Sequence, residues 1–253
     1  VDVISSDFLY RTMDAICNTV AKVQHVHGPR TFVVRAEFLT GGPTTGQRIE
    51  SMFMHVPGLN VVVPSNPIDA CGLMLTALQE PRATIIFEDR MIEDATTDER
   101  DALLRDLLVG EVLVDGVPVE VDPIPFGSAR IRKPGKGLTV VTYGLTTRLC
   151  DAVLRDTPYE HIDLRTLWPL DTKTLIESVG RTGALLVVEP DTGGVGAEVI
   201  AQIAVALDNN FFYERLASPR VTIPACRELH DRLLPSAEQI LAAAEWLAAG
   251  GAG

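Results

Sequence analysis

The chain has 253 residues, of which 46% are hydrophobic and 22% are charged, values typical of a soluble globular protein with room for two domains. Its formal net charge of −12 argues against nucleic acid and anionic membrane surfaces as partners, because both are negatively charged. The four scattered cysteines form no CxxC pair, and the longest apolar stretch, 236–249, contains polar residues, so we expect a cytoplasmic protein that does not cross a membrane.

Elements of the first half alternate between helix and strand. Apolar residues at three- and four-residue spacing between Leu9 and Val23 predict an amphipathic helix. The elements predicted after it are strand 32–38, helix 46–54, strand 60–65, helix 67–79 and strand 83–88. The strands are continuously apolar, as expected of parallel strands with helices on both faces. This half therefore predicts an α/β domain.

The segment 90–137 differs in character from what precedes it. It contains a predicted acidic helix at 97–108, a candidate hairpin at Asp115-Gly116 and a basic stretch rich in Pro and Gly at 130–137, which we interpret as a domain connection. The elements predicted after it are strand 138–142, helix 146–156, strand 161–164, helix 171–179, strand 184–189, helix 196–208, strand 220–223 and helix 236–249. We thus expect two tandem three-layer α/β domains, one over 1–122 and one over 123–253.

Short motifs occur in a fixed order along both halves. Those of the first half are Asp14-Ala15-Ile16-Cys17, His55-Val56-Pro57-Gly58-Leu59, Val63-Pro64-Ser65, Asp69-Ala70 with Gly72-Leu73, and Phe87-Glu88. Those of the second half are Tyr143-Gly144, Ile162-Asp163-Leu164-Arg165-Thr166-Leu167 with Pro169-Leu170-Asp171, Val188-Glu189, Gly193-Gly194 and Ala197-Glu198. In these motifs and their order the chain resembles the beta subunits of thiamine-diphosphate-dependent 2-oxo acid dehydrogenases, such as the pyruvate and branched-chain enzymes. Only an acidic segment, 90–120, looks like an insertion.

The resemblance implies an N-terminally incomplete pyrimidine-binding-type domain followed by a transketolase C-terminal domain. It also implies an alpha-type partner subunit that carries the diphosphate and its magnesium, an α2β2 assembly, and a lipoyl-bearing acyltransferase as acceptor. The cofactor would then lie between subunits. The sequence itself agrees that the diphosphate is held elsewhere, because it contains no GDG-type motif for a metal and a diphosphate. We therefore expect this chain alone not to bind a diphosphate, and we name no metal site on it with certainty of position.

Two stretches depart from the family pattern. The glutamate that activates the cofactor falls upstream of residue 1, and the family's pyrimidine-stacking aromatic residue falls in 3–7, where this chain has Ser5 and Ser6 as cofactor-binding candidates. The family's active-site histidine is missing too. Counting residues back from Pro57 puts Thr45 at its position, whereas counting forward from Arg35 puts Arg48 there. Threonine can only hydrogen-bond and arginine can only hold a positive charge, whereas a histidine can also relay protons.

Several polar residues have both a functional and a structural interpretation. Arg48 and Glu50 are either active-site residues or a solvated first helix turn. For Asp163 and Arg165 we expect an internal ion pair at a strand end, for His161 and His230 ordinary surface or hydrogen-bonded roles, and for Glu189 a role in subunit packing. The segment Ala77, Leu78, Glu80 and Arg82 matches a loop that binds a monovalent cation in some relatives, and the Arg82 guanidinium would replace that cation.

Three functions are consistent with these observations. The first is a beta-type subunit that, with its alpha-type partner, decarboxylates a 2-oxo acid and transfers the acyl fragment. The second keeps the cofactor but forms a carbon–carbon bond, as an acyloin-forming or transketolase-like enzyme does. The third is a noncatalytic scaffold subunit, which the absence of the aromatic residue and the histidine favours.

Overall fold

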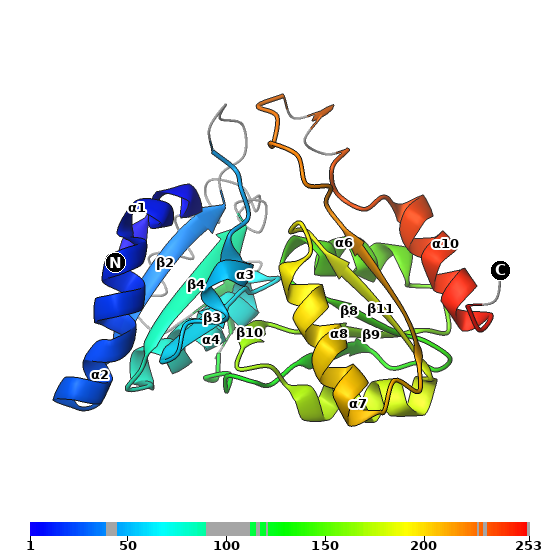
Figure 1. Cartoon of the computed structure of the whole chain (residues 1–253), viewed down its shortest axis with the longest axis horizontal. Helices are drawn as coiled ribbons and strands as arrows, with labels where there is room; N and C mark the ends of the chain where they lie inside the picture. Colours follow the sequence, from blue (N-terminus) through cyan, green and yellow to red (C-terminus); the bar gives the residue numbers. More distant parts are fainter. Residues whose placement is uncertain are drawn as a thin grey trace.

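The structure is a computed structural model that describes residues 1–38, 45–89, 121–226, 228–229 and 232–251, together with the backbone of 112–114 and 117–119. Figure 1 shows two α/β units side by side. The elements of the first are β1 (Asp2–Val3), the 3₁₀ turn η1 (Ser6–Phe8), α1 (Leu9–Asp14), the π-helical segment η2 (Ala15–Val20), α2 (Ala21–His27), β2 (Phe32–Phe38), α3 (Glu50–Phe53), β3 (Leu59–Val62), α4 (Pro67–Gln79) and β4 (Ala83–Asp89). After them come β5 (Val112–Val114), β6 (Val117–Val119), β7 (Arg130–Lys133), β8 (Thr139–Thr142), α6 (Leu145–Val153), β9 (Glu160–Asp163), β10 (Thr166–Trp168), α7 (Thr172–Thr182), β11 (Ala184–Glu189), α8 (Gly194–Ala206), β12 (Phe212–Ala217) and α10 (Ala237–Ala248).

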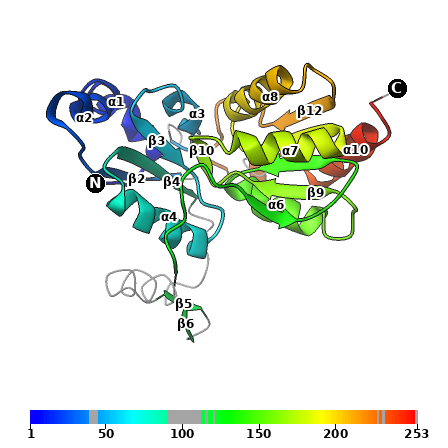
Figure 2. The ribbon, with the colours of Figure 1, turned by 90° about the horizontal axis from the view of Figure 1, so that it is seen from below.

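The first sheet has the strand order β1-β2-β4-β3-β10, and every neighbouring pair is parallel except β10 with β3. Strands β3 and β4 are buried along their whole length, because both faces of the sheet are covered there. Along β4, Ile85 and Phe87 pack in the cluster that contains Leu9 of α1, whereas Ile86 packs with Leu73 of α4. Helices α1 and α2 therefore lie on one face and α4 lies on the other (Figure 2).

The second sheet has the strand order β12-β11-β8-β9-β7, in which only β7 runs antiparallel to its neighbour. Side chains alternate along β11, as the period of a strand requires. Leu185 and Val187 pack with α7 and α8, whereas Leu186 and Val188 pack with α6 and α10. The expectation of two three-layer α/β domains is confirmed.

The two domains share one core and a polar seam. Strand β10 follows β9 of the second sheet but pairs with β3 of the first, and one hydrophobic cluster contains strand residues of both sheets. Across the same seam, Ser65 Oγ donates to Asp163 Oδ2 at 2.5 Å, and the Arg165 guanidinium lies 2.8 Å from Asp69 Oδ1. Asp163 and Arg165 thus have internal roles, as expected, although Arg165 forms its ion pair with Asp69.

Two predicted elements differ most from the structure. The helix expected at 46–54 contains only α3, because Gly46 has a φ of 101° and its N–H donates to the Asp7 carboxylate. The strand expected at 220–223 is not formed, and β12 lies earlier in the chain. Pro219 and Pro224 flank the expected strand and carry no backbone N–H for a ladder.

The expected connection between the domains is partly regular structure. The stretch 130–137 contains β7, and the hairpin expected at 115–116 is supported by antiparallel pairing of β5 with β6, in which Val114 is opposite Val117. The hairpin tip itself, the acidic helix expected at 97–108 and His230 lie outside the described residues. The domain boundary between 122 and 123 stays a prediction. Within the described part, no helix is long and apolar enough to span a membrane.

Candidate functional site

The turn η1 holds the loop that leads into α3. Asp7 accepts hydrogen bonds from the backbone N–H groups of Gly46, at 2.8 Å, and Gln47, at 3.3 Å. Ser5 Oγ donates to the same carboxylate at 3.0 Å, and Ser6 Oγ donates to the carbonyl oxygen of Gln47 at 3.5 Å. Ser5 and Ser6 are both fully buried. The structure therefore brings the serines together with the loop that contains the other predicted site residues.

The Arg48 side chain is largely enclosed where β2 and β4 end. Its Nη1 and Nη2 lie 2.5 and 3.1 Å from the two carboxylate oxygens of Asp89, and its Nε lies 3.0 Å from Glu50 Oε1. The guanidinium carbon stands 3.8 Å from the centre of the Phe38 ring. Burial alone lowers the pKa of a guanidinium, but Asp89 and Glu50 raise the pKa of Arg48 above its ordinary value. The interpretation as a solvated helix turn is therefore wrong, while Thr45 lies half-buried at the start of the same loop.

Buried polar atoms without partners gather beside Arg48. Glu50 Oε2, Tyr143 Oη and Glu189 Oε1 have no hydrogen-bond partner, and their side chains are fully buried. Burial, partly offset by Arg48, raises the pKa of Glu50 to about 7. Burial, partly offset by a backbone N–H group, raises the pKa of Glu189 to about 7 as well. Asp191 is also buried and adds negative charge to the group.

Glycines let the second domain approach this group closely. The Gly196 N–H donates to Glu189 Oε2 at 2.9 Å, and a Cβ on Gly196 would lie 2.6 Å from Glu189 Oε1. A Cβ on Gly194 would likewise lie 2.6 Å from Ser51 Oγ, which itself donates to Asp191 Oδ2 at 2.6 Å. The glycine-rich motif at 193–196 thus allows the start of α8 to contact both Glu189 and α3.

Sequence reasoning missed Asp89, Tyr143 and Asp191 as members of the site. Asp89 ends β4, Tyr143 follows β8 and Asp191 follows β11, and these strands are parallel to their neighbours in their sheets. Because the carboxyl ends of parallel strands meet at one edge, where α/β ligand sites gather, this position was the available signal. Tyr10 also faces the group, since burial and then the charges of Asp7, Asp191 and Glu50 raise its pKa.

The candidate cation positions lie elsewhere, at the end of α4. Ala77 is buried within that helix, whereas Leu78, Glu80 and Arg82 are exposed. The Glu80 carbonyl accepts from Thr31 Oγ1 at 2.9 Å and from the Arg82 N–H at 2.8 Å. Among the described residues, Arg82 and Glu80 form no ion pair, and no three His, Cys, Asp or Glu side chains are grouped to hold a metal ion. Replacement of a cation by Arg82 stays a prediction.

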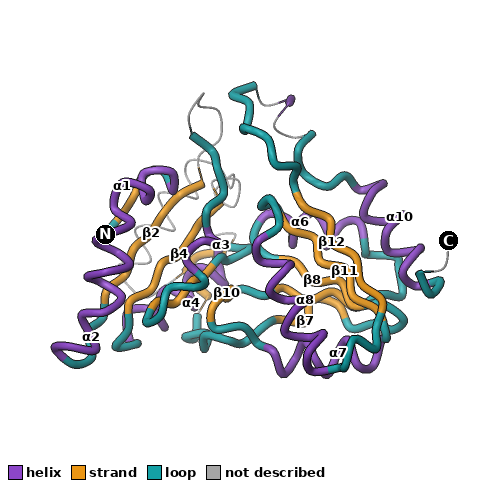
Figure 3. The backbone as a smooth tube through the Cα atoms, viewed as in Figure 1, coloured by secondary structure: helices purple, strands orange, loops and turns teal. Residues whose placement is uncertain are grey.

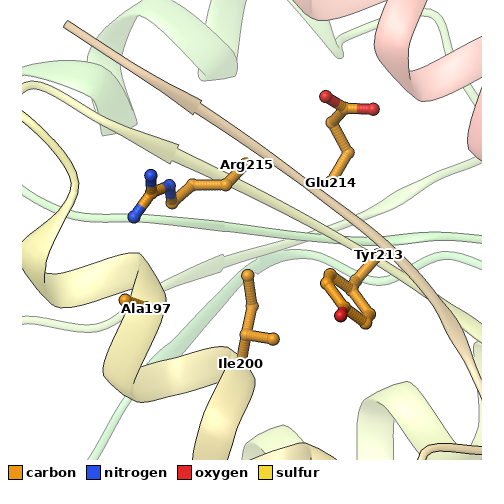
Figure 4. Close-up of a pocket in the computed structure, with 5 residues that line it drawn as sticks. All are labelled: Ala197, Ile200, Tyr213, Glu214 and Arg215. Carbon is orange, nitrogen blue, oxygen red and sulfur yellow. The ribbon is translucent and has the colours of Figure 1, made fainter.

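A pocket of about 340 Å³ lies between α8 and β12, lined by Ala197, Ile200, Tyr213, Glu214 and Arg215. Figure 4 shows Tyr213 and Arg215 directed toward α8, while Glu214 points to the other side of the strand. The Arg215 guanidinium donates to the Gly193 carbonyl and lies 3.7 Å from Glu189 Oε1. Because this charge is already engaged within the protein, we assign the pocket no ligand.

Comparison with known families gives one match in each domain. Residues 1–92 match the pyrimidine binding domain of transketolase, and residues 127–240 match the transketolase C-terminal domain. A solved structure titled "Split gene transketolase, inactive beta4 tetramer" is similar with a TM-score of 0.75 and 17% identity, and the match covers 98% of this chain and 75% of that one. At this identity the similarity concerns the fold alone.

Curated relatives give the same result at higher identity. The beta subunit of acetoin:2,6-dichlorophenolindophenol oxidoreductase from Cupriavidus necator is 33% identical over 97% of this chain and 72% of its own length. The beta subunit of the pyruvate dehydrogenase E1 component from Rickettsia conorii is 30% identical over 96% of this chain and 74% of its own length. A mitochondrial 2-oxoisovalerate dehydrogenase subunit beta from Dictyostelium discoideum is 34% identical over 78% of this chain, which spans about half (53%) of that relative.

Proposed function

Since the chain belongs to the family of thiamine-diphosphate-dependent 2-oxo acid dehydrogenase beta subunits, we propose that it is the beta-type subunit of an enzyme that decarboxylates a 2-oxo acid and transfers the acyl or aldehyde fragment. Its activity requires an alpha-type subunit. The observation that carries this proposal is the match to a beta subunit at 33% identity across 97% of the chain, which includes both domains.

The described residues fit only part of the cofactor. When bound, thiamine diphosphate supplies a thiazolium carbon that attacks the 2-oxo group. It also supplies the aminopyrimidine that accepts the proton of this carbon. Among the described residues no side chains are grouped to hold magnesium, and at the pyrimidine-facing stretch Ser5 and Ser6 are buried and hydrogen-bonded within the chain. The proposal that the alpha-type partner holds the magnesium and the diphosphate at an interface rests on family membership.

We assign the polar edge of the first domain to the wall of that site. Ser5 and Ser6 lie beneath that wall and hold its loop through Asp7 and the Gln47 carbonyl, and Thr45 or Arg48 takes the place of the family histidine. Thr45 can donate a hydrogen bond to an anionic group. Arg48 holds Asp89 and Glu50 in place, because its guanidinium is bound to both carboxylates and stays charged. Neither residue can relay a proton as an imidazole does.

The assembly proposed for this subunit is an α2β2 heterotetramer with beta–beta contacts. A lipoyl-bearing acyltransferase is the proposed acceptor of the acyl fragment. All four cysteines lie in the described part of the chain and all are free, which suits a reducing compartment such as the cytoplasm.

Isothermal titration tests the proposal. Thiamine diphosphate with magnesium is titrated into the full-length chain alone and into its complex with the co-purified alpha-type subunit, and the products from added 2-oxo acids are identified by mass spectrometry. We expect saturable binding only in the complex, followed by acyl transfer. Binding to the chain alone would contradict the interface site, and a carbon–carbon ligated product would favour the acyloin-forming alternative. No binding in the intact complex would favour the scaffold subunit.

A further inference from the structure

Carboxylates outnumber guanidinium groups in the polar cluster around Arg48, which lies at one part of the seam between the two domains. The carboxylates are Glu50 and Asp89 of the first domain and Glu189 and Asp191 of the second, and the guanidinium groups are those of Arg48 and Arg215. With every group ionised, four negative charges would face two positive charges. The four carboxylates are buried, and an uncompensated charge in such surroundings is strongly unfavourable.

Hydrogen bonds show which carboxylates remain unsatisfied. Asp89 binds Arg48 through both oxygens, and Asp191 accepts from Ser51 Oγ and from the Thr192 N–H. Glu50 and Glu189, by contrast, each have one oxygen without a partner. A protonated carboxyl group removes one negative charge from the seam, so these two side chains are the favourable sites for a proton.

Other titratable groups face this pair from the surrounding elements. The Tyr143 hydroxyl follows β8 and is buried without a partner, and Tyr10 of α1 is half-exposed. Asp7 faces Tyr10 from η1. None of these groups supplies a positive charge. Arg48 and Arg215 are the cations that the described residues place in this cluster, whereas Arg165 lies elsewhere along the seam and is paired with Asp69.

We infer that Glu50 and Glu189 form a proton-binding site that holds at least one proton in the folded protein at neutral pH, and that release of this proton loosens the contact of α3 with the second domain. Glu50 lies on α3, whereas Glu189 ends β11, so a second ionised carboxylate places like charges on opposite sides of the seam. The site needs no cofactor and does not depend on the proposed catalytic role.

The direction of the pH effect follows from proton linkage. The pKa of Glu50 and that of Glu189 rise from 4.5 to about 7 on folding, so the folded chain binds these protons more tightly than the unfolded chain does. The stabilisation is complete below pH 4.5 and is lost as the pH rises to about 7. Above that range the contribution of these groups is constant.

Unfolding of the full-length chain in urea between pH 5 and pH 8 tests the inference. Between about pH 5 and pH 7, the folded-to-unfolded ratio of the wild type should fall more steeply than that of Glu50→Gln, by about tenfold per pH unit. Glu189→Gln should show the same reduced slope. Glu177→Gln on α7 is the matched control, because Glu177 is exposed, and it should keep the wild-type slope.

Hydrogen exchange provides a second measurement, which is made first on the wild type. After correction for intrinsic rates, the backbone amides of 49–54 and 189–196 in the wild type should be less protected at pH 8 than at pH 6, and Glu50→Gln should remove this difference. A reduced unfolding slope in either glutamine variant supports the site. Equal slopes in the wild type, Glu50→Gln and Glu189→Gln would overturn it, and if Glu50→Gln does not fold, Glu189→Gln and the wild-type exchange decide.

Discussion

At the residue scale, the Arg48 guanidinium is enclosed by two carboxylates and an aromatic ring, with only 9% of its side chain exposed. Replacing it with methionine would leave the Asp89 and Glu50 carboxylates buried without their cation. Removing one partner of a buried ion pair costs about 3–5 kcal/mol, so we expect Arg48→Met to lower the free energy of unfolding by about that amount. Urea unfolding at pH 7 measures this change.

Arg155→Met is the matched control for this substitution. Arg155 is exposed and forms no ion pair with a described residue, so its replacement should change the free energy of unfolding by about 0.5 kcal/mol or less. Because Glu50 can take up a proton when Arg48 is removed, the loss from Arg48→Met should be smaller at pH 6 than at pH 8. Equal losses in Arg48→Met and Arg155→Met would contradict the buried pair.

For the candidate site, a single sequence predicts which residues align with functional positions of the family. It does not predict the contacts that these residues make. Ser5, Ser6, Thr45 and Arg48 were found because neighbouring motifs fix the count along the chain. The pairing of Arg48 with Asp89 joins residues 41 positions apart in the sequence. No local pattern records such a contact, because it depends on how β2 and β4 align in the sheet.

At the element scale, Gly58 ends the turn between α3 and β3 in a conformation that favours glycine, with a φ of 87°. A Cβ there would lie 2.7 Å from Gln24 Nε2 and closer still to the Ala21 carbonyl oxygen, so this turn packs directly on α2. Gly28 has a similar φ of 79° but nothing within 4 Å of its Cβ position. Substitutions at the two glycines therefore distinguish two contributions to the loss of stability: the positive φ of the backbone, which both share, and the contact with α2, which only Gly58 has.

Gly28→Ala should lower the free energy of unfolding by about 1–3 kcal/mol, because its φ of 79° with a ψ of 176° is a backbone conformation that essentially only glycine adopts. Gly58→Ala should lose at least about 1 kcal/mol more, because the added methyl group forces α2 and the turn apart. Parallel urea titrations of both variants give the difference. Equal losses would show that the turn can move away from α2 without cost.

The same scale shows which elements a sequence can predict. Strand β11 and helix α4 were predicted at their observed bounds, because an apolar run and a proline at the start of a helix are local signals. Strand β10 was not predicted, because its three residues gain their regularity only by pairing with β3 of the other domain. Strand β12 begins in the aromatic run Phe211-Phe212-Tyr213 and therefore lies earlier in the chain than the predicted strand at 220–223.

On the scale of the whole molecule, the two sheets meet along a seam at β10, which lies between them in Figure 3 and pairs with β3 of the first sheet. One hydrophobic cluster runs across the seam, and the Ser65–Asp163 and Asp69–Arg165 contacts lie beside it. Separating the domains would expose this shared core to water at a cost that neither domain alone could offset. We therefore expect the two domains to unfold in one transition.

The two tryptophans of the chain can test this cooperativity separately. Trp168 lies in β10 at the seam, and Trp246 lies in α10 on the far side of the second domain. In Trp246→Phe the fluorescence reports on the seam alone, and in Trp168→Phe it reports on the second domain alone. In each variant, the urea midpoint from fluorescence should coincide with the midpoint from far-ultraviolet circular dichroism. A seam signal that changes at lower urea than the circular dichroism would mean that the domains separate before they unfold, so the shared core would not couple them.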